Sequence, residues 1–116
     1  MKRDMAKKKA KADVVASSGN VFADFGVRNA EEKQTRLRLT VVINRVIQSR
    51  KLSQTAAARR LKVSHPKVSA LANYRLEGFS VERLMNFLTA LGRDVQIVIR
   101  RHPRTRRGGR IVVTAG

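Results

Sequence analysis

The stretch that decides the fold is residues 53–73, which read SQTAAARRLKVSHPKVSALAN. Ser53 and Ser64 are both good N-cap residues, because a serine hydroxyl can accept a hydrogen bond from the first turn of a helix. Helix-forming residues follow each of them. The sequence therefore predicts one short helix over 54–61 and a second from Ser64 to about Asn73, with a brief break between them.

Two short helices that meet across a tight turn form a helix-turn-helix motif. The first helix needs a small residue where the second crosses it, and Ala58 supplies one. The apolar residues that fill the shared core at the required offsets are Ala57, Leu61, Val63, Val68 and Leu71. Lys62 departs from the pattern, since this turn position usually holds glycine with a positive φ. A lysine there costs roughly 1 kcal/mol.

Helices are also predicted on both sides of this stretch. Asn29 precedes Glu32 by three residues, a capping-box spacing, so a helix is expected to begin there and run to about Arg50. Its apolar stripe has the spacing of one buried helix face and comprises Leu39, Val42, Ile43, Val46 and Ile47. Downstream, Ser80 caps a helix that ends before Gly92. A mainly helical domain of four to five helices follows from this pattern.

The C-terminal part has the pattern of a β-strand instead. Val95, Ile97 and Ile99 alternate with other residues over 94–100, and 110–114 is a second β-prone run. A strand edge needs a partner. The sequence thus predicts a short C-terminal strand at a dimer interface, made by the three alternating residues. A hairpin between the two runs within one chain is the alternative.

Charge points to a polyanionic partner. The 116 residues contain 26 Lys and Arg against 8 Asp and Glu, a net charge of +18, which favours nucleic acid or an anionic membrane surface. Residues 1–12 hold six basic side chains and one acid, and residues 100–110 hold six arginines and no acid. We therefore divide the chain into a flexible basic arm with an apolar strap (1–28), a helix-turn-helix domain (29–92) and a C-terminal strand or hairpin with an Arg-rich loop (93–116). The Lys run either contacts phosphate or only improves solubility.

Several function classes are excluded by composition. The chain has no Cys, which rules out disulfides and thiolate zinc sites, and its two histidines make a metal site improbable. No apolar run approaches the roughly 20 residues of a membrane span. A nucleophile–base pair, a carboxylate dyad and a Gly-rich phosphate loop are not recognisable, so we expect neither an enzyme nor a cofactor.

The motif stretch resembles the Cro/C1-type (XRE) helix-turn-helix family. The wider chain resembles its HigA-type antitoxin and regulator branch through the segments GNVFADFG (19–26), AEE (30–32), PKVSAL (66–71), GFSVERL (78–84) and LGRDV (91–95). The resemblance implies a dimeric DNA-binding repressor in the bacterial cytoplasm, associated with the nucleoid when bound to DNA. It also implies a gene commonly encoded beside a RelE/HigB-like ribonuclease toxin.

In such a motif the second helix enters the major groove with its N-terminal end first. We expect His65 and Lys67 to face base edges, with Lys67 donating to guanine. Pro66 either touches a thymine methyl group or only stiffens the turn. Gln54 is placed to bond a phosphate at a helix N-terminus. The full predicted DNA-binding set is Gln54, Lys62, Ser64, His65, Pro66, Lys67, Ser69 and Arg75.

One motif reads only about four to six base pairs, so a homodimer on an inverted-repeat operator is expected. Val21, Phe22 and Phe25 form an apolar island that either packs on the domain or contacts a protein partner. This leaves two alternative functions. One is a toxin-neutralising module with secondary DNA autoregulation. The other is a basic RNA-binding protein, which the four Phe and one Tyr support poorly because no stacking platform is recognisable.

Overall fold

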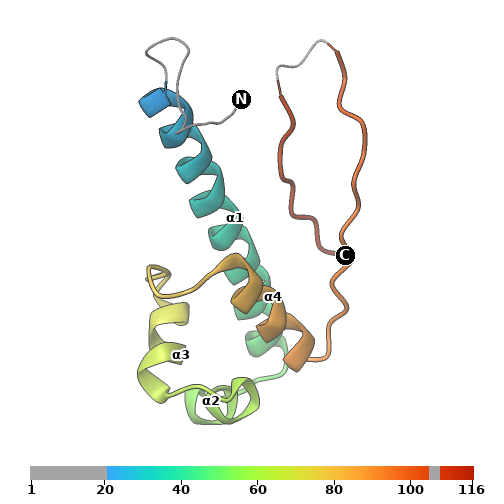
Figure 1. The fold of residues 1–116 in the computed structure, drawn as a ribbon. Coiled ribbons are helices and arrows are strands. Elements are labelled where there is room, and N and C mark those ends of the chain that lie inside the picture. The colour runs from blue at the N-terminus through green and yellow to red at the C-terminus, as the bar shows by residue number, and fades with distance from the viewer. Residues whose placement is uncertain (1–20, 105–107) are drawn as a thin grey trace. The chain divides into compact units, whose positions relative to one another are not determined.

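The structure is a computed structural model that describes residues 21–104 and 108–116. The described part contains four helices and no strand: α1 (Val21–Ser49), α2 (Gln54–Leu61), α3 (His65–Ala72) and α4 (Val81–Ala90) (Figure 1). The chain divides into two compact units, residues 1–32 and 33–116. The described part of the first unit is helical, and the second unit contains the motif and its core.

The first helix begins earlier than predicted. Asn29 lies inside α1, which starts at Val21, so Asn29 does not cap the helix. Residues 30–36 are mostly good helix formers, no proline interrupts the preceding segment, and Gly26 costs only about 1 kcal/mol, so the helix extends backward through it. Its end at Ser49 lies one residue before the predicted end. The apolar island is therefore part of a helix, and its role in partner contact stays a prediction.

The core of the second unit forms where α1, α3 and α4 present their apolar faces to one another. Its fully shielded members include Ile43, Leu71, Leu84 and Leu91. The remaining buried members are Leu39, Val46, Leu61, Phe79, Phe87 and Leu88. The predicted stripe of α1 is thus confirmed, with Val42 and Ile47 at its half-buried margins. Thr40 is buried on the same helix, and its hydroxyl donates to the Arg36 carbonyl at 2.8 Å.

The short helices begin at the predicted serines. The Ser53 hydroxyl accepts from the Ala56 N–H at 3.1 Å, and the Ser80 hydroxyl accepts from the Arg83 N–H at the same distance. Ser64 occupies the N-cap position of α3 but makes no side-chain capping bond. Side-chain capping bonds therefore mark the starts of α2 and α4, whereas α3 begins at its predicted serine without one.

Three helices are followed, within two residues of their last residue, by a non-glycine residue with positive φ. Lys51 follows α1, Lys62 follows α2 and Tyr74 follows α3, with φ values of 54°, 59° and 58°. The left-handed conformation lets the chain close the helix end, as when Val63 N–H donates to the Ala58 carbonyl at 3.0 Å. The predicted left-handed turn at Lys62 is confirmed.

The predicted C-terminal strand is not formed within the described residues 93–104 and 108–116. Figure 1 shows the chain leaving α4 as one long irregular run and returning as another. Val95 and Val113 pack against the core, whereas Ile97, Val98 and Ile99 are 64–92% exposed. A strand requires a hydrogen-bonded neighbour, and neither an intrachain hairpin nor another sheet supplies one here.

Candidate nucleic-acid interface

The helix-turn-helix is built on a small core of its own. Ala57, Ala58 and Val68 are buried against one another, with Ile47 and Val63 packed at the margin. Figure 1 shows α2 and α3 meeting at a steep angle. Because the contact is made by two alanine methyl groups, the helices approach closely, as predicted for Ala58. This close approach holds α3 in a fixed direction relative to α2.

The first turn of α3 is directed outward. Val68 and Leu71 on one face are 3% and 0% exposed, while Ser64, His65 and Pro66 at the leading end are exposed. The burial thus agrees with the expected placement of the motif's second helix. Since Ser64 makes no capping bond, its hydroxyl is available to an external partner.

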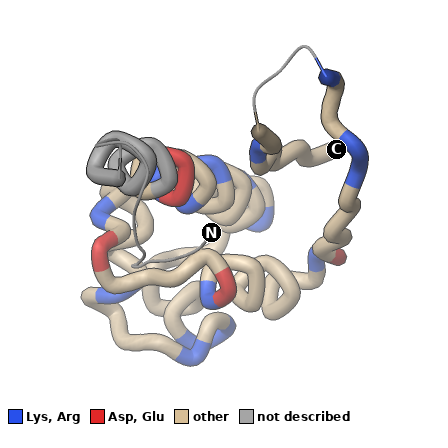
Figure 2. The backbone as a smooth tube through the Cα atoms, turned by 45° about the horizontal axis from the view of Figure 1, so that its top comes forward, with Lys and Arg blue, Asp and Glu red and all other residues tan. Residues whose placement is uncertain are grey.

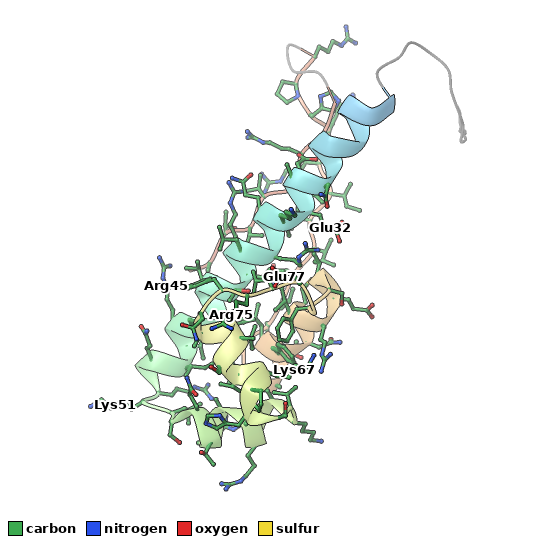
Figure 3. The ribbon with its side chains drawn as sticks, turned by 90° about the vertical axis from the view of Figure 1, so that its left-hand side faces the viewer. Glu32, Arg45, Lys51, Lys67, Arg75 and Glu77 are labelled. Carbon is green, nitrogen blue, oxygen red and sulfur yellow. The ribbon has the colours of Figure 1, made fainter. Side chains whose placement is uncertain are left out.

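Lys67 is held differently from a fully extended surface lysine. It is half-buried, and its Nζ lies 5.3 Å from the centre of the Phe79 ring. A Cβ on Gly78 would lie 3.5 Å from the same nitrogen. Figure 3 shows Lys67 beside α4, while Lys51 lies on the opposite side of the motif in this view. Lys67 is therefore positioned by the α3–α4 loop as well as by its own helix.

A second cationic side chain, that of Arg83, lies over the Phe79 ring. The guanidinium carbon of Arg83 lies 5.8 Å from the Phe79 ring centre and 5.7 Å from that of Phe87. The two rings meet edge to face at 5.9 Å and 72°. Each cation–π contact contributes roughly 0.5–1 kcal/mol at an exposed site. Sequence reasoning missed Phe79 and Arg83; the aromatic residue directly before the N-cap Ser80 was the available signal.

A hydrogen bond from α1 fixes the far end of α3. Asn44 Nδ2 donates to the Leu71 carbonyl at 3.1 Å, across 27 residues of sequence. The same carbonyl accepts from the N–H of Tyr74 at 3.1 Å, and Asn73 Nδ2 donates to the Ser69 carbonyl at 2.9 Å. These bonds satisfy carbonyls that a helix end otherwise leaves unpaired. Asn44 is thus a positioning residue for α3 that the sequence did not indicate.

The surroundings of the motif are basic. Residues 50–76 contain seven Lys and Arg and no Asp or Glu: Arg50, Lys51, Arg59, Arg60, Lys62, Lys67 and Arg75. Of the predicted contacts, Gln54, Lys62 and Arg75 are exposed and Ser69 is half-buried. Figure 3 places Arg75 and Glu77 in the loop beyond α3, and Figure 2 shows blue on most described elements and red at only a few points. Such a surface attracts anions.

Two other kinds of site are absent from the described part of the chain. The described residues contain no group of three His, Asp or Glu side chains that could hold a metal ion. None of the helices in this part of the chain is long and apolar enough to cross a membrane. The candidate site rests instead on the exposed leading turn of α3 at Ser64, His65 and Pro66.

Comparison with known proteins agrees with this geometry. A model of a helix-turn-helix domain family matches residues 21–100. A solved structure described as "Putative XRE Family Transcriptional Regulator" is 60% identical in sequence and superposes with a TM-score of 0.73. The match covers 76% of this chain and 99% of that one. Among curated proteins no significant match is found.

Proposed function

Because the chain belongs to the helix-turn-helix family, we propose that it is a sequence-specific transcriptional regulator that binds double-stranded DNA. The observation that carries this proposal is the leading turn of α3, which is exposed at Ser64, His65 and Pro66 while Val68 and Leu71 anchor it from behind. The similarity to an XRE-family regulator supports the same function.

In the proposed complex α3 enters the major groove with its N-terminal end first. His65 and Lys67 approach base edges, and the unpaired hydroxyl of Ser64 donates to a base or phosphate. Pro66 stiffens the turn between them. Ser69, one turn further along α3, reaches a base or a phosphate.

Backbone contacts fix the register of the motif on the duplex. Gln54 is the first residue of α2, where the unpaired N–H groups and the helix dipole favour a phosphate. Lys62 in the turn and Arg75 after α3 are exposed and add positive charge on either side. These contacts supply affinity without sequence information and make binding strongly salt-dependent.

Lys67 has to leave the Phe79 ring in order to read a base. The contact it gives up is worth about 0.5–1 kcal/mol. A well-placed contact to guanine O6 and N7 discriminates by about 1–3 kcal/mol. The exchange is therefore favourable at the right base pair and unfavourable elsewhere, which adds to sequence discrimination.

We further propose that the regulator is a homodimer acting as a repressor on an inverted repeat. The support is the extended run at 95–99, where Ile97 is 75% and Ile99 is 92% exposed. Val95 holds the start of this run against the core. Pairing of this run with its copy about a two-fold axis would supply the missing ladder and cover the apolar side chains.

The decisive experiment is selection of binding sites from a random duplex library by the full chain. We expect enrichment of an inverted repeat whose half-sites are about 10 base pairs apart or a multiple of that. Competition with single- and double-stranded RNA tests the RNA-binding alternative. Enrichment of no motif, or RNA outcompeting duplex DNA, would refute the proposed function.

The antitoxin setting rests on the resemblance to HigA-type proteins and stays a prediction. It expects a small RelE-like ribonuclease encoded next door and bound through Val21, Phe22 and Phe25. Co-expression with the neighbouring reading frame tests this. Capture of that product by the full chain, lost in a variant shortened to residues 29–116 that still binds DNA, supports the antitoxin role and separates it from regulation alone.

A further inference from the structure

Residues 96–104 and 108–112 lie between two points at which the chain is attached to the domain. Val95 and Val113 both pack against the core, so the segment leaves and returns at anchored points. The nine residue-to-residue steps from Val95 to Arg104 can span up to about 30 Å. Figure 1 shows the outgoing and returning runs after α4. Arg104 can therefore lie well away from the point at which Val95 is held.

This part of the chain has an apolar stem and a basic end. The exposed side chains of the stem are Ile97, Val98, Ile99, Ile111 and Val112. Beyond them lie Arg100, Arg101, Arg104 and Arg110, all exposed, and no acid follows Asp94. The match to the family model ends at residue 100, so Arg101, Arg104 and Arg110 lie outside the segment that this chain shares with the family. The motif and its dimer contact use none of them.

Arginine at this place favours DNA phosphates as the partner. Its planar guanidinium is weakly hydrated and bonds phosphate oxygens in pairs, and arginines also enter narrow minor grooves. Proteins with extended arms use such residues in the minor groove. Since α3 already holds a duplex in the proposed function, contact by the arm is intramolecular, with an effective concentration in the millimolar range for a short linker.

We propose that the described residues 96–104 and 108–112 form a DNA arm, a second and sequence-independent contact with the duplex that flanks the site read by α3. Arg101, Arg104 and Arg110 bind backbone phosphates or the minor groove there. The inference rests on the proposed function for its duplex partner, and it adds a site that the helix-turn-helix does not provide.

The test compares two triple variants of the full chain. One carries Arg101→Gln, Arg104→Gln and Arg110→Gln. The matched control carries Lys33→Gln, Arg38→Gln and Arg45→Gln, which remove the same charge from exposed positions of α1. Sedimentation first establishes that both have the oligomeric state of the parent chain. Affinity is then measured by fluorescence anisotropy from 50 to 200 mM KCl, on duplexes with and without flanking base pairs.

The salt slope is the steepness with which the logarithm of the binding constant falls with the logarithm of the KCl concentration. We expect the arm variant to lower this slope by up to about 2.7 per protomer, because each neutralised phosphate contributes about 0.9. Over this fourfold range of salt, the parent then loses about 40-fold more affinity per protomer than the arm variant. The control keeps the parental slope. On a duplex trimmed to the site itself, the parent and arm variant become similar, because the flanking phosphates are gone.

An arm variant with the parental slope on the long duplex would overturn the proposal. So would loss of binding to single-stranded RNA, or to vesicles containing phosphatidylserine, with binding to duplex unchanged. The slopes are also measured on duplex of unrelated sequence. If the slopes of the parent and the arm variant still differ on that duplex, the arm is supported even if site selection finds no operator. The arm proposal and the proposed function can therefore be refuted independently.

Discussion

Replacing Lys62 with glycine should stabilise the protein and weaken its binding to DNA. The residue sits at φ 59° and ψ 44°, in the left-handed turn between α2 and α3. That conformation costs a non-glycine residue about 1–2 kcal/mol. Glycine removes this strain. It also raises the conformational entropy of the unfolded chain, which lowers the free energy of unfolding by about 0.4–1 kcal/mol. Central values of about 1.5 and about 0.7 kcal/mol give a net stabilisation of about 0.8 kcal/mol, or roughly 3–6 °C in Tm for a domain of this size.

The charge of Lys62 accounts for the opposite effect on binding. If its ammonium contacts one phosphate, Lys62→Gly lowers the salt slope by about 0.9 per protomer. Thermal unfolding followed by circular dichroism gives the Tm, and anisotropy titrations over a range of KCl give the slope.

Two control variants separate strain from charge. Lys62→Gln keeps the positive φ and loses the charge, so its Tm should match the parent while its slope falls. Lys51→Gly relieves the same strain after α1, at φ 54°, and should raise the Tm, while its slope should fall less than that of Lys62→Gly because Lys51 lies on the opposite side of the motif from Lys67. A Lys62→Gly variant that is no more stable than the parent would refute the strain argument. An unchanged slope would remove Lys62 from the interface.

Four further outcomes follow from the structure. Lys67→Ala should relax base preference at one position of each half-site and weaken the free energy of DNA binding by about 1–3 kcal/mol. An unchanged profile of selected sites would contradict this. Asn44→Ala removes the bond to Leu71; it should cost about 1 kcal/mol in chemical unfolding and reduce the ratio of specific to non-specific affinity more than total affinity. Ala58→Leu should overpack the contact between α2 and α3 and cost about 1–3 kcal/mol, measured by urea unfolding, whereas full stability would show that the helices have room to separate. Ile99→Lys should shift sedimentation toward the monomer, and a dimer of unchanged affinity would place the interface elsewhere.

The sequence predicted what local chemistry determines. The Ser53 and Ser80 caps and the alternation of buried and exposed residues in α1 depend on neighbours within a few residues, so they could be recognised directly. The start of α1 could not, because the capping-box spacing at Asn29 competes with helix propagation from a strong helical segment. A capping pattern shows where a helix can begin, and does not show that the preceding residues stop it.

Long-range contacts account for the rest. Asn44 and Leu71 are 27 residues apart, and nothing in either local pattern indicates that they meet. The position of Lys67 depends on Phe79 in the following loop, and no local spacing in the sequence specifies that contact. At Ile97 and Ile99 the alternation predicted a strand that the described residues do not form, because a strand needs a hydrogen-bonded neighbour and the periodicity of one run does not show that such a neighbour exists.

The exposed apolar stem also makes the protein prone to aggregation as long as nothing covers it. Short β-branched runs with free backbone groups are typical starting points for fibrillar aggregation. Arg100 and Arg101 follow one such run and Arg110 precedes the other, where they act as gatekeepers by electrostatic repulsion between molecules. We therefore expect concentrated salt, which screens this repulsion, to favour precipitation, and low ionic strength to protect the purified chain.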